Sequence, residues 1–172
     1  PIGLSCMLLA KLAGARVIST DIVDYRVQRA IDLGVDTAVN THRDDLGQIV
    51  LDMTDGVGVD KVIECVGADQ DETLSQAVEV VKKSGLVVVV GSFAQNRATV
   101  PIIDFKFSEK SLIGSQGMPE GYGPVFQLMS SGKLDVKPLI THRVPLAMAP
   151  HALDLMDRKD EQVMKVVLQP QT

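Results

Sequence analysis

Apolar residues along this chain fall into two alternating patterns. Short continuous runs rich in valine and isoleucine are typical of strands that are covered on both faces. Between them lie longer stretches in which apolar residues recur at helical spacing and which end at glycines or polar turns. This alternation is typical of successive βαβ units. We therefore expect the α/β class and a doubly wound parallel sheet of the Rossmann type.

The same patterns give the expected elements. Helices are predicted over residues 4–12, 24–33, 45–53, 72–82, 122–131 and 149–158. Strands are predicted over residues 16–20, 37–40, 59–66, 86–90 and 111–115, with a closing strand within 162–168. Asp24 is expected to cap the second helix and Gly34 to end it in the left-handed conformation. A turn is expected at 83–85.

The opening stretch has the arrangement of a dinucleotide-binding unit. A helix begins at Gly3, a β-branched strand follows, and Asp21 stands at its carboxyl end, eighteen positions after Gly3. In such units the last glycine of Gly-x-Gly-x-x-Gly lets the helix pack on its strand, and an acid about 20 residues later binds the adenosine ribose. Only this last glycine is in the sequence, so we expect the first strand and its glycine turn to precede Pro1.

Asp21 is the strongest candidate for a functional residue. Its carboxylate would accept hydrogen bonds from the ribose 2′- and 3′-hydroxyls of NAD and would repel a 2′-phosphate. Ile22 and Val23 supply no cation for that phosphate. The sequence therefore predicts NAD rather than NADP. The alternative is an aspartate that only caps the loop before the next helix.

Further candidates lie near the same edge of the sheet. Arg26 could place its guanidinium over the adenine or along the ribose, or could be a solvated helix residue. Gly67, Gly91 and Gly114 each follow a strand, where a missing side chain lets a ligand approach the backbone. Each could also be an ordinary turn. Together with Asp21 they predict a lined crevice.

The composition excludes several classes of protein. The chain has 172 residues, 45% of them hydrophobic and 23% charged, with a net charge of −5. It has no basic patch for nucleic acid and no apolar run of the roughly 20 residues that span a membrane. Its two cysteines make no disulfide framework, which suits a reducing compartment. We expect a cytoplasmic protein that binds neither nucleic acid nor membranes.

No catalytic residue and no metal ligand are expected within this chain. His42, His142 and His151 are not spaced as ligands, and no cysteine or glutamate joins them. Cys65 is expected to be a small residue at a strand end and not a nucleophile, because no base is recognisable nearby. Cys6 and Cys65 are not expected to form a metal cluster.

Several motifs together resemble one family, the medium-chain zinc-dependent alcohol and polyol dehydrogenases, in particular the sorbitol-dehydrogenase type. The resemblance covers nearly the whole chain and rests on these segments: Pro-Ile-Gly-Leu at 1–4, Ser-Thr-Asp at 19–21, Arg26, Leu-Gly-Val-Asp at 33–36, Val-Ile-Glu-Cys-Val-Gly at 62–67, Val-Val-Gly at 89–91, Leu-Ile-Gly-Ser at 112–115 and Val-Lys-Pro-Leu-Ile-Thr-His-Arg at 136–143. It implies a cofactor domain over residues 1–133, truncated at its amino end. It also implies a segment, 134–172, that returns to a catalytic domain.

The resemblance also implies a cofactor-binding set. Ile2 and Gly3 would face the pyrophosphate, and Asp21 and Arg26 the adenosine. The remaining members include Val66 and the residues of the nicotinamide side: Val90, Gly91, Ser92, Ser115, Gln116 and Gly117. Polyol members of the family carry a substrate-binding arginine near the position of Gly117.

The function implied is hydride transfer between a secondary alcohol or polyol and NAD. Zinc would be held in a catalytic domain outside this chain. Family members pair through the last strand of this sheet, which implies a homo-oligomer, a dimer or a tetramer. The alternatives are a nucleotide-binding module without catalysis, a zinc-free medium-chain reductase, and a Rossmann-like methyltransferase. The methyltransferase is disfavoured because the family pattern continues from Leu112 to Arg143.

Overall fold

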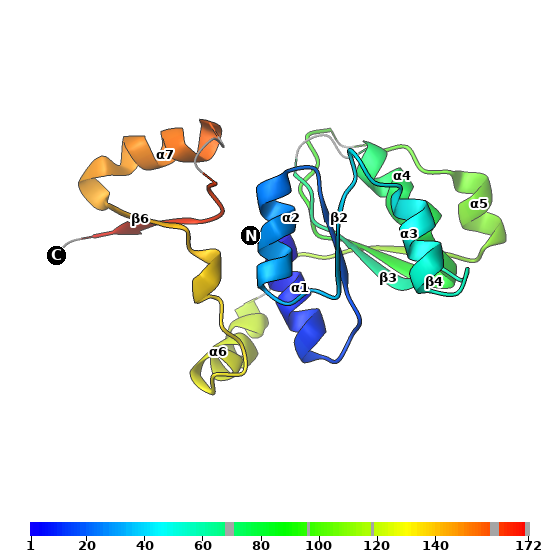
Figure 1. The fold of residues 1–172 in the computed structure, drawn as a ribbon, viewed down its shortest axis with the longest axis horizontal. Helices are drawn as coiled ribbons and strands as arrows, with labels where there is room; N and C mark the ends of the chain where they lie inside the picture. The colour runs from blue at the N-terminus through cyan, green and yellow to red at the C-terminus, as the bar shows by residue number, and fades with distance from the viewer. Residues whose placement is uncertain (68–70, 96, 118, 159–161, 171–172) are drawn as a thin grey trace. The chain divides into compact units, whose positions relative to one another are not determined.

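The computed structural model shows an α/β protein in which helices alternate with parallel strands (Figure 1). The structure describes residues 1–67, 71–95, 97–117, 119–158 and 162–170. These residues form two compact units. One unit comprises Pro1–Asn40 and Glu120–Thr172, and the other comprises Thr41–Pro119.

The first unit opens with two helices and two parallel strands. They are α1 (Ile2–Leu12), β1 (Ile18–Asp21), α2 (Asp24–Asp32) and β2 (Thr37–Asn40). β1 and β2 pair in parallel, and Asp21 lies in register with Asn40 at their carboxyl ends. The core beside them contains Leu4, Met7 and Ala30. Other apolar residues of α1, such as Leu9, are exposed.

The carboxyl-terminal part of the chain completes this unit. It contains α6 (Tyr122–Ser130), β6 (His142–Pro145), α7 (Ala149–Arg158) and β7 (Val166–Gln169), with short 3₁₀ turns at Pro119–Gly121, Lys137–Leu139 and Leu146–Met148. β6 and β7 pair in parallel. Leu139 and Met164 are buried in the same core as Leu4 and Met7, so this segment packs on the opening helix.

The second unit is a parallel sheet of three strands in the order β3-β4-β5. Its elements are α3 (Leu46–Met53), β3 (Val59–Glu64), α4 (Asp71–Val80), β4 (Val81–Val89), α5 (Ile102–Phe107) and β5 (Ser111–Gly114). Its core brings α4 onto β4 through Leu74, Ala77, Val78, Val81 and Val87.

Local sequence explains where several helices begin and end. The Asp45 carboxylate accepts the Gln48 backbone N–H, which caps α3. Gly34 follows α2 with φ of 82°, the left-handed stop that was expected. The expectation that Asp24 caps α2 is wrong. Val23 occupies the N-cap position and Asp24 is the first helical residue, because the Asp24 carboxylate is engaged by Asn40.

The junction of α4 and β4 also differs from the sequence-based expectation. Residues 81 and 82 were expected in the helix, yet the strand begins at Val81, which pairs with Val59. The turn expected at 83–85 lies inside this strand, where the register between β3 and β4 shifts. Ser84 has φ of 56°, and its neighbour Gly85 is buried against β3. The valine run therefore continues through an irregular strand.

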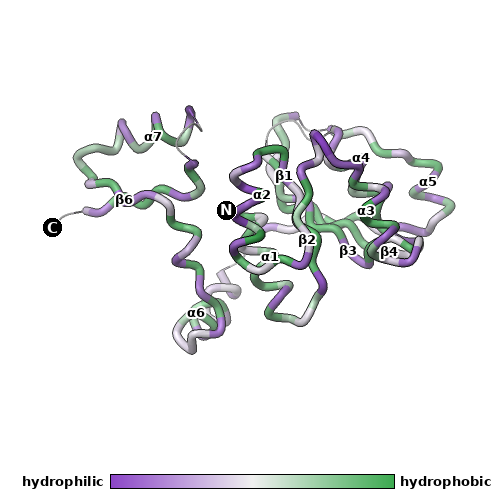
Figure 2. Tube along the Cα trace, viewed as in Figure 1, coloured by the Kyte–Doolittle hydropathy of each residue, from purple (hydrophilic) through white to green (hydrophobic). Residues whose placement is uncertain are grey.

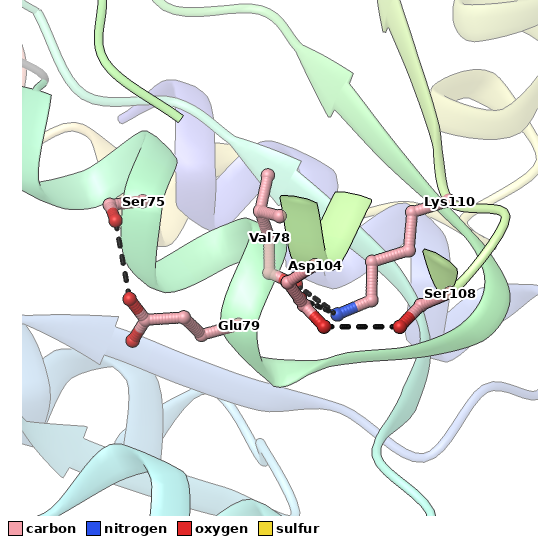
Figure 3. A network of polar contacts seen from close by, with 6 residues as sticks. All are labelled: Ser75, Val78, Glu79, Asp104, Ser108 and Lys110. Atoms are coloured by element: carbon pink, nitrogen blue, oxygen red, sulfur yellow. Dashed lines mark hydrogen bonds and ion pairs between the residues drawn. The ribbon is translucent and has the colours of Figure 1, made fainter. Parts of the chain in front are cut away.

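A buried lysine ties α4, α5 and β5 together (Figure 3). The side chain of Lys110 is only 5% exposed. Its ammonium donates to the Val78 carbonyl and to the Asp104 carboxylate, at 2.7 Å each. Ser108 donates to the same carboxylate at 3.0 Å. This contact compensates the buried charge with two oxygen acceptors.

The expected α/β class with parallel strands is confirmed, whereas two elements had no counterpart in the expectation. α5 was missed because its apolar residues follow no clear helical period. It is largely hydrophobic in Figure 2, yet Ile102, Ile103 and Phe107 are exposed. β6 was missed because His142 and Pro145 are poor strand formers.

Candidate functional site

Asp21 stands at the carboxyl end of β1, where parallel sheets bind their ligands. One carboxylate oxygen, Oδ1, accepts the Val23 backbone N–H at 3.0 Å. The side chain remains 29% exposed, so it is oriented by the loop and still open to hydroxyl donors. This geometry fits a ribose: a fixed carboxylate can accept two hydroxyl hydrogen bonds without ordering itself first.

Arg26 lies beside Asp21. Its Nη1 is 3.6 Å from Asp21 Oδ2, and its side chain is about as exposed as that of Asp21. The structure thus brings together the two residues that the sequence paired for the adenosine. The guanidinium partly balances the carboxylate charge, and both side chains stay partly exposed.

The first turn of α1 contains Ile2 and Gly3, both exposed. Within the described residues no side chain caps this turn, and it contains no acidic residue. The first backbone N–H groups of a helix have no intrahelical partner and favour anions. This turn therefore offers donors that would suit a pyrophosphate group, and the role of Ile2 and Gly3 stays a prediction.

A second group of candidate residues lies at the carboxyl ends of β3 and β4, and Glu64 connects them. The Glu64 carbonyl accepts the N–H groups of Val90 and Gly91 at 2.8 and 3.0 Å. Its carboxylate accepts the Val66 N–H at 2.8 Å and the Thr73 hydroxyl at 3.2 Å. Glu64 is buried, and the sequence analysis gave it no role beyond the family motif. A carboxylate at the end of an apolar strand is the signal that could have identified it.

The remaining candidates extend this edge of the second unit. Ser115 donates its backbone N–H to the Val89 carbonyl at 2.8 Å, which continues the ladder past the end of β5. Exposed residues follow on from these strand ends: Ser92, Gln116 and Gly117. Ile2, Gly3, Asp21 and Arg26 belong to the other compact unit. Each group thus lies at strand or helix ends within its own compact unit. The cofactor roles of both groups stay predictions.

The histidines and cysteines make no recognisable metal site. Among the described residues no three His, Cys, Asp or Glu side chains could hold a metal ion together. Cys6 and Cys65 take part in no disulfide among the described residues. His142 contacts the Thr141 hydroxyl through Nδ1 at 3.0 Å, which gives it a polar partner within its own segment. These side chains do not fit the ligand set of a zinc site.

Comparison with known proteins establishes the family. Residues 1–131 match the family model for zinc-binding dehydrogenases, and the chain belongs to that family. A sorbitol dehydrogenase of Halalkalibacterium halodurans is 33% identical over 181 residues, which is 99% of this chain and 49% of that protein. The resemblance that the sequence motifs suggested is confirmed.

Solved structures agree with this assignment. An alcohol dehydrogenase from Thermus sp. ATN1 has a TM-score of 0.89 at 29% identity, covering 98% of this chain and 48% of that one. A structure from Sinorhizobium meliloti 1021, described as a zinc-binding dehydrogenase bound to NADP, has a TM-score of 0.84 at 28% identity. The match covers 98% of this chain and 49% of that one. The Rossmann-type fold is therefore confirmed.

The chain spans about half the length of the relatives that it matches. Within the described part of the chain, no helix is both long and apolar enough to cross a membrane.

Proposed function

We propose that this chain is the NAD-binding part of a zinc-dependent dehydrogenase that transfers hydride between a secondary alcohol or polyol and NAD. The observation that carries the proposal is the Asp21 carboxylate, oriented by the Val23 N–H and still accessible at the carboxyl end of β1. Family membership supports the reaction class. The sorbitol dehydrogenase named above supports the substrate class.

In this proposal the residues of the chain bind and orient the cofactor. NAD, when bound, accepts or returns the hydride. Asp21 and Arg26 hold the adenosine, the first turn of α1 receives the pyrophosphate, and the ends of β3, β4 and β5 support the nicotinamide. The cofactor residues on these strand ends are Val66, Val90, Gly91, Ser92, Ser115, Gln116 and Gly117. Zinc would be held by residues outside this chain, because no described set of side chains fits it.

Asp21 favours NAD over NADP for an electrostatic reason. A carboxylate that accepts ribose hydroxyls repels a 2′-phosphate at the same place. The related structure bound to NADP makes this choice worth testing directly. In the complete enzyme, Asp21→Ala should weaken NAD binding about 5- to 150-fold, the effect of losing about 1–3 kcal/mol of hydrogen bonding.

Titration of the full-length enzyme with each nucleotide measures this effect. Asp32→Ala is a matched control, because Asp32 is an exposed aspartate at the far end of α2. It should leave both dissociation constants unchanged. Preference of the wild-type enzyme for NADP, or indifference to the loss of the Asp21 carboxylate, would refute the role of Asp21.

The further parts of the proposal concern the whole enzyme. Residues 1–133 form its cofactor domain and 134–172 belong to its catalytic domain. Polyol members of the family carry a substrate-binding arginine near the position of Gly117, and its absence here weighs against a sorbitol-like substrate within the proposed class. We place the enzyme in the cytoplasm, which suits two cysteines that are not joined by a disulfide in the described part of the chain.

We also propose a homo-oligomer, a dimer or a tetramer, that pairs through β5. Among the described residues β5 pairs with β4 alone, and its Leu112 and Ile113 side chains are exposed. An apolar strand edge of this kind needs a partner or a cover. Light scattering of the full-length enzyme should give at least twice the mass of one chain, and a strict monomer would contradict this part.

A further inference from the structure

Asn40 is a buried polar residue next to the candidate ribose site. It is the last residue of β2 and only 4% exposed. Its register partner on β1 is Asp21, so the two residues end neighbouring parallel strands. A buried amide group needs hydrogen-bond partners, because leaving it unpaired destabilises the fold. The partners of the Asn40 amide therefore show which segment it fixes in place.

Two hydrogen bonds of the Asn40 amide reach the segment that follows Asp21. Nδ2 donates to Asp24 Oδ1 at 2.6 Å and to the Ile22 carbonyl at 3.4 Å. Between these two residues, Val23 donates its N–H to Asp21 Oδ1. The loop is therefore attached to β2 on both sides of the residue that orients the Asp21 carboxylate.

We propose that Asn40 is a positioning residue for the choice between NAD and NADP. By holding residues 22–24 against the end of β2, Asn40 keeps the Val23 N–H aimed at Asp21 and fixes the Asp21 carboxylate toward the ribose. Asn40 itself does not touch the cofactor. This inference rests on the proposed function, because it concerns how the same site is kept selective.

The physical consequence is a change in selectivity. A fixed carboxylate favours the two ribose hydroxyls and disfavours a 2′-phosphate. A released loop lets the carboxylate turn away, so NAD loses affinity and NADP is rejected less. A residue that only stabilised the fold would lower the melting temperature and leave the ratio of the two dissociation constants unchanged.

A charge swap in the full-length enzyme tests this directly, with NAD and NADP dissociation constants measured by calorimetric titration well below the melting temperature. Asn40→Asp places two carboxylates against each other and removes the donors, so the NADP-to-NAD ratio of dissociation constants should fall about tenfold. Asp24→Asn keeps an oxygen acceptor and should stay near wild type. The double variant Asp24→Asn with Asn40→Asp restores a donor and an acceptor in reversed order and should recover most of the ratio.

Two other variants provide the controls. Asp36→Ala removes contacts to Lys11 and to the Val17 N–H at the opposite end of β1, so it should lower the melting temperature without changing the ratio. Asp24→Ala removes the same hydrogen bond from an exposed position. If the Asn40 variants do not fold, the NADP-to-NAD ratio of dissociation constants measured for Asp24→Ala tests the proposal in their place.

The outcomes separate the two proposals. If the wild-type enzyme binds neither nucleotide, the proposed function fails and this inference fails with it. If NAD binds and Asp21→Ala weakens it, while Asn40→Asp or Asp24→Ala leaves the ratio within about twofold of wild type, only the positioning role is overturned. A lowered ratio that the swapped pair restores supports it.

Discussion

Gly85 occupies a position in β4 that leaves no room for a side chain. A Cβ there would lie 2.5 Å from Val81 Cγ2, 2.8 Å from the Lys82 carbonyl oxygen and 3.1 Å from the Asp60 carbonyl oxygen. Two of these atoms are backbone and cannot rotate away. Gly85→Ala should therefore destabilise the full-length protein by about 1–3 kcal/mol, measured as the free energy of unfolding in urea.

Gly123 gives the matched control for this substitution. It lies in α6, and nothing lies within 4 Å of a Cβ built there. Gly123→Ala should be neutral or stabilising by up to about 1 kcal/mol, because alanine favours helices more than glycine does. Equal stabilities for the two variants would mean that the strand around Gly85 can open at little cost.

Residues of the site differ in how far their roles could be predicted from sequence. The place of Asp21 at the end of β1 was predictable from its distance to Gly3 and from the strand pattern before it, and its cofactor role stays a prediction. The contacts of Asn40 were not predictable, because an asparagine at the end of a short strand is typical of the turn that follows. Only the pairing of β1 with β2 shows that its amide is buried and faces Asp24. Glu64 was missed as a connecting residue, although a carboxylate directly after Val62 and Ile63 is a signal that the sequence contains.

At the scale of elements, the ion pair of Lys110 and Asp104 holds the connection from α5 to β5. The ammonium is buried, whereas the Asp104 side chain is 47% exposed. Asp104→Asn should cost about 1–3 kcal/mol of unfolding free energy at neutral pH, since it leaves the buried charge without its anion. Lys110→Met should cost less, because it removes the charge and keeps an apolar stem of similar length.

The pH dependence of this pair has a definite sign. The hydrogen bond from Lys110 lowers the pKa of Asp104 below its usual value, with a smaller contribution from Ser108. A carboxyl group with a lowered folded-state pKa adds stability above its unfolded pKa of about 4, and this stability is lost as the pH falls through the folded value. The difference in unfolding free energy between wild type and Asp104→Asn should thus have its full value at pH 7 and decrease at acidic pH. A difference that is constant down to pH 2 would contradict this account.

Elements were predictable where one local signal dominated. α2 and its end at Gly34 follow from apolar spacing and a glycine with positive φ. The start of β4 at Val81 was not predictable, because a helix and a buried strand share the same valine run and only pairing with Val59 decides between them.

At the scale of the whole molecule, the strand neighbours fit the doubly wound order 3-2-1-4-5-6. In the described residues β1 pairs with β2, and β3 pairs with β4, which in turn pairs with β5. The order 3-2-1-4-5-6 contains a first strand between the strands numbered 2 and 4. β1 and β3 belong to different compact units.

Folding of residues 1–172 alone tests this strand order. If this chain lacks the central strand of that order, some backbone groups of its sheets lack partners, at a cost of about 1–3 kcal/mol each when they are buried. A few such groups would remove a typical stability margin of about 5–15 kcal/mol. The isolated chain should therefore unfold at low temperature in a broad transition, while the full-length enzyme unfolds cooperatively and is stabilised by NAD. Calorimetry compares the two directly. A cooperative transition of the isolated chain at an ordinary temperature, raised by NAD, would show that its strands close without that central partner and that the expected strand order is wrong.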